Sequence, residues 1–187
     1  MIKYIITDFD GTLVDTMKAN MAAYTEAFES LGYEFSDKLY AKAFGLRFDD
    51  MCNALGVTEN KTVRDKIRTL KSEVYPKYFD LIKVNKELLH FIASIPDVKV
   101  AIATTAAKKN FYNVMRHVLP GVTVDAIVTG EDVKNGKPDP EVYNIAKEKL
   151  GVTDNSEVIV FEDSEVGIQA AKASGAHYMI ISQEQFL

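Results

Sequence analysis

The feature that most constrains the fold is a repeating pattern in the second half of the chain. From Val98 onward, short apolar runs alternate with stretches of helical periodicity. This order is typical of a parallel sheet covered by helices on both faces. An apolar run near the N-terminus adds one further strand. We therefore expect an α/β fold, a doubly wound, Rossmann-like parallel sheet, with strands at residues 4–7, 98–103, 126–128, 158–161 and 178–181.

The helices expected between these strands have recognisable ends. One should begin at Asp139-Pro140, where a capping residue precedes a proline suited to the first helical turn, and end at Gly151. Another should begin near Ser164 and end at Gly175. Both helices then connect parallel strands, as the fold class requires.

The stretch between residues 15 and 81 breaks this alternation. It shows helical periodicity and no convincing strand, and Met17, Met21 and Tyr24, for example, share one helical stripe. Its length is sufficient for a small helical bundle inserted after the first strand. We therefore predict an inserted α-helical cap domain at 15–81 and an α/β core formed by 1–14 and 82–187, with hinges near residue 15 and at 81–84.

Composition restricts the partners and the location of the chain. The formal charge is −5, and no long basic run is present that would neutralise a nucleic-acid backbone. No apolar stretch approaches the roughly 18 residues of a membrane span, and Met1 leads into a strand rather than a cleavable leader. We therefore expect a cytoplasmic protein without nucleic-acid or membrane partners, either a monomer or a weak homo-oligomer. Because surplus negative charge repels anions, a phosphate site here would need local cations.

Two aspartates stand where the first strand ends. Asp8 and Asp10 are two residues apart, so their side chains share a face and can converge in the loop beyond the strand. Gly11 allows a sharp turn there, and the hydroxyl of Thr12 is placed to hold the second carboxylate. Paired carboxylates in such a loop are typical of a metal or phosphate site, although the same residues also cap ordinary turns.

Polar residues follow the next three strands as well. In an open parallel sheet, ligands bind beyond the carboxyl ends of the strands. Each residue alone has an ordinary explanation as a helix cap or a solvated loop residue. Together, acids at two strand ends would hold Mg²⁺ while lysine and hydroxyl groups bind phosphate oxygens, which indicates a phosphoryl-transfer site. The residues concerned are Thr104 and Thr105, then Lys137, and finally Glu162 and Asp163.

These residues resemble the haloacid dehalogenase superfamily of phosphohydrolases, which uses four motifs in this order. The run Asp8-Phe9-Asp10-Gly11-Thr12 resembles the first motif. Thr104 is similar to the second motif, Lys137 to the third and Glu162-Asp163 to the fourth. The inserted helical stretch resembles the helical cap of the first type in that family, so the resemblance spans the whole chain.

The resemblance implies a role for each motif residue. Asp8 would attack phosphorus and form an aspartyl-phosphate, and Asp10 would protonate the leaving alcohol and then accept a proton from water. Thr105 is expected to contribute to phosphate binding beside Thr104. The resemblance further implies Mg²⁺ binding by Asp8, the Asp10 carbonyl and Asp163 with Glu162 in support, and phosphate binding by Thr104 and Lys137.

The second aspartate narrows the chemistry that the resemblance implies. Dehalogenases and phosphonatases of the superfamily lack an acidic residue where Asp10 stands, so its presence favours phosphate esters. We therefore expect a phosphatase that acts on a small phosphorylated metabolite, of the sugar phosphate or phosphoglycolate type.

A phosphomutase similar to β-phosphoglucomutase is the alternative within the superfamily. That branch generally has a histidine in the helix after the first motif, where this chain has Asn20, and a cap arginine close to the place of Arg47. Loss of the histidine favours hydrolysis, and Asn20 and Arg47 become candidates for substrate recognition by the cap. A phospho-accepting receiver domain of signalling proteins is a more remote alternative, because the large insertion after the first strand does not fit it.

Overall fold

The structure is a computed structural model of residues 1–187, and it describes the chain apart from residues 44–45, 47, 58–59, 183–185 and 187. The described residues form a five-stranded parallel sheet of order β5-β4-β1-β6-β7. Every expected strand is present to within one residue at either end. The strands are β1 (Tyr4–Thr7), β4 (Lys99–Ala103), β5 (Ala126–Val128), β6 (Val158–Glu162) and β7 (His177–Ile180).

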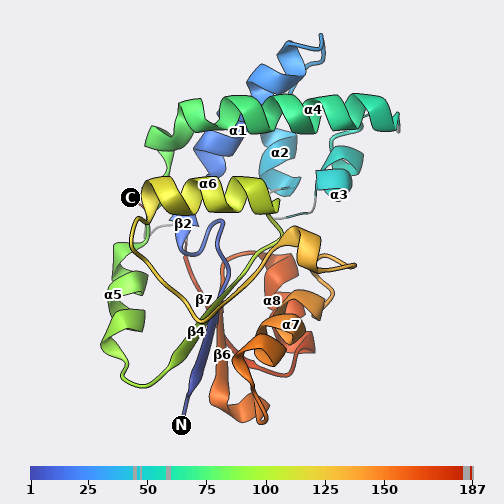
Figure 1. Ribbon diagram of the computed structural model, residues 1–187. Coiled ribbons are helices and arrows are strands. Elements are labelled where there is room, and N and C mark those ends of the chain that lie inside the picture. Colours follow the sequence, from blue (N-terminus) through green and yellow to red (C-terminus); the bar gives the residue numbers. More distant parts are fainter. Residues whose placement is uncertain (44–45, 47, 58–59, 183–185, 187) are drawn as a thin grey trace.

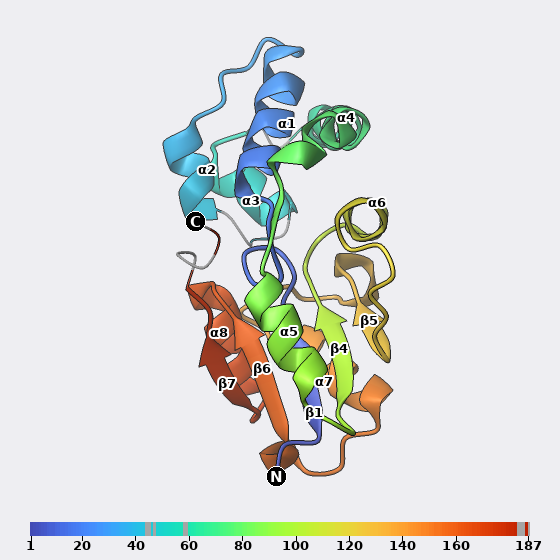
Figure 2. The same cartoon turned by 90° about the vertical axis from the view of Figure 1, so that its left-hand side faces the viewer.

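Helices cover both faces of this sheet (Figures 1 and 2). The helices α5 (Lys86–Ser94) and α6 (Lys108–Val118) pack on one face, and α7 (Glu141–Leu150) and α8 (Glu165–Ala173) pack on the other. The fold class expected from the sequence is therefore confirmed.

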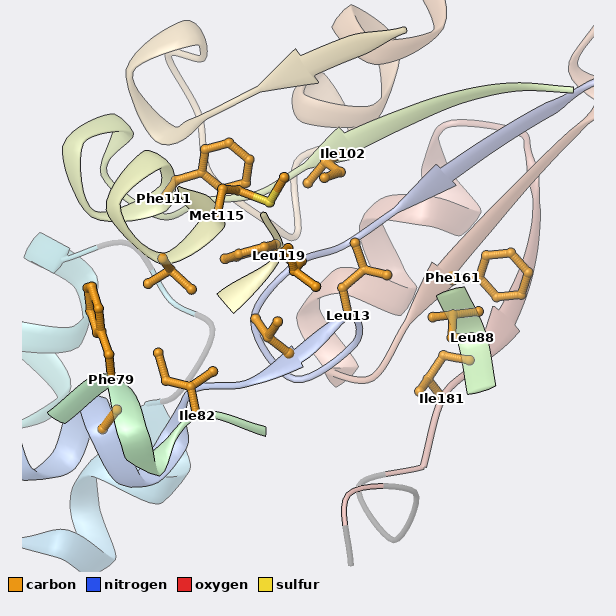
Figure 3. Close-up of a cluster of buried hydrophobic side chains, with 14 of the residues drawn as sticks. Leu13, Phe79, Ile82, Leu88, Ile102, Phe111, Met115, Leu119, Phe161 and Ile181 are labelled. Atoms are coloured by element: carbon orange, nitrogen blue, oxygen red, sulfur yellow. The ribbon is translucent and has the colours of Figure 1, made fainter. Parts of the chain in front are cut away.

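Alternation along the central strand explains the two layers, because successive side chains of a strand point to opposite faces. Ile5 packs in one cluster with Leu88 and Phe111, and part of this cluster is drawn in Figure 3. Its neighbour Ile6 packs in the opposite cluster with Tyr143. Full burial of an apolar side chain of this size stabilises the folded protein by about 1.5–3 kcal/mol.

The helix ends agree closely with the sequence. Helix α7 begins at Glu141, one residue later than expected, and the Asp139 side chain accepts a hydrogen bond from the Glu141 backbone N–H at 2.9 Å. In α8 the Ser164 hydroxyl accepts from the Gly167 backbone N–H at 3.1 Å. Gly175 follows that helix with a φ of +77°, the left-handed conformation that glycine adopts without strain.

A group of helices lies beyond the carboxyl ends of the strands (Figure 1). No strand occurs among the described residues between Met17 and Leu81, as the periodicity predicts. The group has an apolar cluster of its own, in which Tyr40, Met51 and Cys52 are buried. The bounds proposed for a separate cap domain stay a prediction. The group consists of α1 (Met17–Glu29), α2 (Asp37–Ala43), α3 (Phe48–Ala54), α4 (Lys61–Val74) and the 3-10 helix η1 (Tyr75–Leu81).

Two very short strands connect this helical group to the sheet. Strands β2 (Val14–Asp15) and β3 (Lys83–Val84) pair with each other in antiparallel fashion. Next to them, the Asn85 side chain donates a hydrogen bond to the Thr12 carbonyl at 3.1 Å. The residues expected as hinges thus form a small ribbon, which the sequence pattern did not predict.

One negative finding concerns membranes. None of the helices formed by the described residues combines the length and the apolar character needed to cross a bilayer.

Candidate active site

The loop after β1 positions the first acidic group. Asp8 is buried, and its backbone N–H donates to the Phe161 carbonyl of the neighbouring strand at 2.9 Å. Gly11 has a φ of +97°, and a Cβ atom added there would overlap the carboxylate of Asp163. Only glycine therefore allows the loop to approach Asp163 this closely.

The expectation that Thr12 holds the second carboxylate of the pair is wrong. The Thr12 hydroxyl instead donates to Oδ1 of Asp163 at 2.8 Å. The residue that holds Asp10 is Thr16, whose hydroxyl donates to Oδ1 of Asp10. Thr16 lies at the start of α1, beyond strand β2, so the spacing of the loop could not indicate which hydroxyl reaches which acid.

Lys137 lies between two buried carboxylates. Its Nζ atom donates to Oδ1 of Asp8 at 2.5 Å and also to Oε1 of Glu162. Burial opposes the charged form of Lys137, but the charges of Asp8 and Glu162 raise the pKa of this ammonium group well above its ordinary value. Lys137 is therefore a permanent cation beside Asp8.

Glu162 is fully buried and uses both of its oxygens. Its Oε1 atom also accepts from the Tyr143 hydroxyl at 3.0 Å, and Oε2 accepts from the Ser164 backbone N–H at 2.7 Å. Although burial opposes it, Lys137 and these hydrogen bonds lower the pKa of Glu162. In this arrangement Glu162 positions Lys137, and the support of Mg²⁺ binding expected for Glu162 stays a prediction.

Burial dominates the electrostatics of the two aspartates. It raises the pKa of Asp8 well above its ordinary value, and the charges of Glu162 and Asp163 act in the same direction while Lys137 opposes them. Burial also raises the pKa of Asp10, against the hydrogen bond from Thr16. A raised pKa suits a carboxyl group that donates a proton near neutral pH, as expected of Asp10, whereas the Lys137 ammonium favours the ionised form of Asp8.

Residues of the first three motifs converge on one cavity of about 130 Å³ between the strand ends and the helical group. Glu162 and Asp163 of the fourth motif are not among the residues that line it. The side chain of Thr104 is buried there, and its hydroxyl accepts from the Ala106 backbone N–H at 3.0 Å. Asn20 reaches the same cavity from α1, whereas Arg47 lies outside the described residues. The predicted site residues that line the cavity are Asp8, Asp10, Asn20, Thr104, Thr105 and Lys137.

The helical group contributes a lysine that the sequence did not assign to the site. The Lys71 side chain lines the cavity, and its Nζ lies 3.5 Å from the centre of the Tyr75 ring and 5.1 Å from that of Tyr24. Burial lowers the pKa of Lys71 to about 7, against the charge of Asp10. Its position four residues after the buried Ile67 was the available signal, because the two residues share a face of α4.

The donor set fits a Mg²⁺ ion with two carboxylate ligands. Among the described residues, no three His, Cys, Asp or Glu side chains are grouped to hold a metal. Asp163 is nevertheless close enough to Asp8 to raise its pKa, and Thr12 fixes its carboxylate. Mg²⁺ commonly takes one or two carboxylates and completes its octahedron with water. Asp8, Asp163 and the Asp10 carbonyl would meet that requirement, and the ligand set, with Glu162 in support, stays a prediction.

Two relatives of known sequence have names that point to the same class of enzyme. The phosphorylated carbohydrates phosphatase of Thermotoga maritima is 33% identical over 178 residues, which cover 91% of this chain and 81% of that protein. The 2-deoxyglucose-6-phosphate phosphatase 1 of Saccharomyces cerevisiae is 29% identical over 186 residues, covering 90% of this chain and 75% of that protein. The fold, the site and these relatives define the class of protein as a phosphoric monoester hydrolase.

The family follows from a match along almost the whole chain. The model of the haloacid dehalogenase-like hydrolases matches residues 5–181. The chain therefore belongs to that family, as its four motifs indicated. The fold is also that of the β-phosphoglucomutase of Clostridium difficile, with a TM-score of 0.84 at 20% identity over 100% of this chain and 87% of that one. At this identity the likeness concerns the fold alone.

Proposed function

We propose that the protein is a Mg²⁺-dependent phosphatase that hydrolyses a small phosphorylated metabolite, of the sugar phosphate type, through an aspartyl-phosphate on Asp8. The observation that carries the proposal is the placement of Asp8 in the cavity, 2.5 Å from the Lys137 ammonium and beside a second aspartate that lines the same cavity. The names of the two relatives, both phosphatases of phosphorylated sugars, support the substrate class.

In the first step a carboxylate oxygen of Asp8 attacks phosphorus. A bond forms between that oxygen and phosphorus while the ester bond from phosphorus to the substrate oxygen breaks. Asp10 gives its proton to the departing alkoxide, so the alcohol leaves neutral. The raised pKa of Asp10 agrees with this duty, because the group must enter the step protonated.

In the second step water replaces Asp8. Asp10, now ionised, accepts a proton from the water whose oxygen attacks phosphorus, and the bond from Asp8 to phosphorus breaks. Inorganic phosphate is released and both aspartates return to their starting states. Two easier displacements thus replace one difficult displacement.

Charge on the transferring group is compensated by fixed donors. Lys137, Thr104 and Thr105 line the cavity where the phosphoryl oxygens would lie. In a buried site such donors act in a low dielectric and need no reorganisation during the reaction. When bound by Asp8, Asp163 and the Asp10 carbonyl, Mg²⁺ would supply further positive charge for the same oxygens.

The helical group would separate the reaction from bulk water, because it provides the opposite wall of the cavity. Asn20 stands there in place of a histidine. An amide cannot take up the proton of a sugar hydroxyl, so this wall favours hydrolysis over return of the phosphoryl group to a sugar.

The proposal is tested with a panel of phosphomonoesters that includes glucose 6-phosphate and glucose 1-phosphate. We expect release of inorganic phosphate with Mg²⁺, loss of it with chelator, and loss of it in Asp8→Asn. The same change at the exposed Asp80 is the matched control and should leave the rate unaltered. Turnover that persists in Asp8→Asn, or isomerisation of glucose 1-phosphate without hydrolysis, would contradict the proposal.

A further inference from the structure

The strand at one end of the sheet has an uncovered edge. Strand β7 is last in the strand order and is the outermost strand in Figure 2. All four of its residues are exposed, and the exposed fractions of its large side chains are 39% for Tyr178, 47% for Met179 and 59% for Ile180. The strand contains no Asp, Glu, Lys or Arg and no proline, although edge strands commonly use charges or proline to avoid pairing with another chain.

The opposite edge of the sheet is protected. The Thr104 backbone N–H donates to the Val128 carbonyl at 3.0 Å, so Val128 directs its backbone groups toward β4 and its neighbour Ile127 directs its own outward. The Lys149 Nζ atom donates to that outward carbonyl of Ile127 at 2.7 Å. At β7 no described residue forms a hydrogen bond with the backbone groups on the free side.

The register of β7 determines which backbone groups lie on the free side. The Ile181 backbone N–H donates to the Glu162 carbonyl at 2.7 Å, so Ile181 and Met179, two residues earlier, direct their backbone groups toward β6. Tyr178 and Ile180 therefore direct theirs outward. Each of them has one N–H donor and one C=O acceptor. An antiparallel strand of the same sequence is complementary to this pattern.

A second copy related by a twofold axis fits the free edge of β7. With the axis at Met179, Tyr178 of one copy lies opposite Ile180 of the other, and each such pair exchanges two N–H···O=C hydrogen bonds. The same two side chains then form a cross-strand pair of an aromatic and a β-branched residue, a combination that stabilises sheets. The Met179 side chains of the two copies face each other at the axis.

The helix beside this edge carries complementary charges. Helix α8 has Glu165 in its first turn and Lys172 in its last, and two residues seven positions apart share one side of a helix. That side lies toward β7, because the Lys172 Nζ atom is 5.2 Å from the centre of the Tyr178 ring. The twofold axis makes the two α8 helices antiparallel, so the basic end of one lies on the side of the acidic end of the other, and the charges attract.

The area of the free edge matches a weak dimer. A large side chain has about 150–250 Å² of surface when fully exposed, so the three half-exposed side chains of β7 offer roughly 300 Å² in each copy. With the paired backbones and the facing sides of α8, the contact approaches about 1,000 Å², the low end of specific interfaces. Dimers with interfaces of this size form at high protein concentration.

We propose that the protein forms a twofold symmetric dimer through β7, which joins the five-stranded sheets of two copies into one continuous sheet. Pairing uses up both β7 edges. The strands then at the ends of the joined sheet are the two β5 strands, whose outward carbonyl is bound by Lys149. Assembly therefore stops at the dimer instead of continuing into a filament. The proposal is independent of the reaction that the cavity carries out.

Sedimentation velocity of the full chain tests the dimer. Between about 1 and 200 µM we expect a reversible equilibrium of monomer and dimer with a Kd of about 10–100 µM. Met179→Lys places two ammonium groups opposite each other at the axis and should raise the Kd by about 10-fold or more. Tyr112→Lys makes the same change of charge at an exposed aromatic residue of α6 and should leave the Kd unchanged.

Cysteine substitutions test the register. Residues opposite each other in a pair without hydrogen bonds have Cα atoms about 4.5 Å apart, a distance that a disulfide bridges. Met179→Cys should therefore cross-link two copies in the presence of oxidised glutathione. Ile180→Cys is the matched control, because its two copies lie on a diagonal of about 7–8 Å and should not be linked. The native Cys52 is buried and does not compete.

The inference is overturned if the chain remains monomeric up to about 200 µM, or if Met179→Lys dimerises as the wild type does. It is also overturned if Ile180→Cys cross-links as fast as Met179→Cys, or if species heavier than the dimer form. Circular dichroism verifies that each variant is folded. If Met179→Lys does not fold, the two cysteine variants decide between the outcomes.

Discussion

At the scale of single residues, two buried lysines of this protein have opposite surroundings. Lys137 lies between Asp8 and Glu162 and keeps its charge. Lys71 lies against the rings of Tyr75 and Tyr24, and no described residue forms a hydrogen bond or an ion pair with its side chain. Burial disfavours the ammonium form more than the charge of Asp10 favours it, so the charged form of Lys71 lowers the stability of the folded protein.

The cost of Lys71 predicts a stabilising substitution. Below pH 7 both the folded and the unfolded chain carry the proton, and the penalty is largest. Between pH 7 and the ordinary value of 10.5 only the unfolded chain binds it, so wild-type stability rises with pH relative to a variant without the lysine. Lys71→Met should raise the free energy of unfolding by about 1–3 kcal/mol at pH 7.

Urea denaturation at pH 7 and pH 9.5 measures this effect, and the gain should shrink at the higher pH. Lys66→Met, at an exposed position of the same helix, is the matched control and should be neutral. A gain for Lys71→Met that does not change with pH would show that packing, not charge, is responsible.

The hydroxyl of Tyr143 predicts a smaller effect on the site. It donates to Oε1 of Glu162, the oxygen that also binds Lys137. Tyr143→Phe removes this donor, so Glu162 attracts Lys137 more strongly and draws it from Asp8. We expect the free energy of unfolding to fall by about 1 kcal/mol. We also expect kcat to decrease, but by less than the roughly 100-fold that the loss of a direct hydrogen-bond donor to the substrate costs. Steady-state kinetics measure kcat, and urea denaturation measures the stability. Tyr112→Phe, at an exposed position, is the control. An unchanged kcat in Tyr143→Phe would contradict the role of the Tyr143 hydroxyl.

At the scale of elements, the sheet and its covering helices could be predicted because their signals are local. Apolar runs, the caps at Asp139 and Ser164 and the glycines at Gly151 and Gly175 each act within one element. Motif residues at strand ends could also be expected together, since a parallel sheet brings those ends to one edge.

What could not be predicted depends on contacts between elements. The ribbon of β2 and β3 pairs residues about 70 positions apart and is only two residues long, so it leaves no period in the sequence. The wrong assignment of Thr12 as the partner of Asp10 has the same origin. Tertiary packing, which the sequence does not show, decides whether Thr12 or Thr16 reaches that carboxylate. The sequence could not show that Lys71 lines the cavity, because a lysine on an apolar stripe usually extends its ammonium group to the surface.

Gly167 shows how an element is adapted to the site. In most helices Gly→Ala is stabilising by roughly 0.5–1 kcal/mol. Here an added Cβ would overlap the carboxylate of Glu162. Gly167→Ala should therefore destabilise the protein and lower kcat, because Glu162 must move and Lys137 moves with it.

Thermal unfolding and the hydrolysis rate check this prediction. Gln169→Ala changes an exposed residue of the same helix and should leave both almost unchanged. An increase in stability for Gly167→Ala would mean that the helix shifts freely and that the close packing is not required.

At the scale of the whole molecule, the chain carries a net charge of −5, and the carboxylates of Asp8 and Asp10 line one cavity. The charges of Glu162 and Asp163 disfavour the ionised form of Asp8. A divalent cation bound there would relieve that repulsion only in the folded state. We therefore expect Mg²⁺ at about 100 times its Kd to stabilise the protein by about 2.7 kcal/mol.

For a chain of this length that gain corresponds to a rise in Tm of roughly 5–10 °C. Thermal scans with Mg²⁺ and with chelator measure it without reference to activity. Asp163→Asn should abolish the shift, whereas Asp125→Asn, at an exposed position of the core, should retain it. A shift of equal size in Asp163→Asn would place the ion elsewhere.

The ribbon of β2 and β3 has a mechanical consequence. Both crossings between the helical group and the sheet are hydrogen-bonded to each other, through Val14 with Val84 and Asp15 with Lys83. They cannot swing separately, so any opening of the wall above the cavity is a rotation about one narrow pivot. The stiffness of these four residues would then set how often substrate enters and phosphate escapes, although none of them takes part in the proposed chemistry.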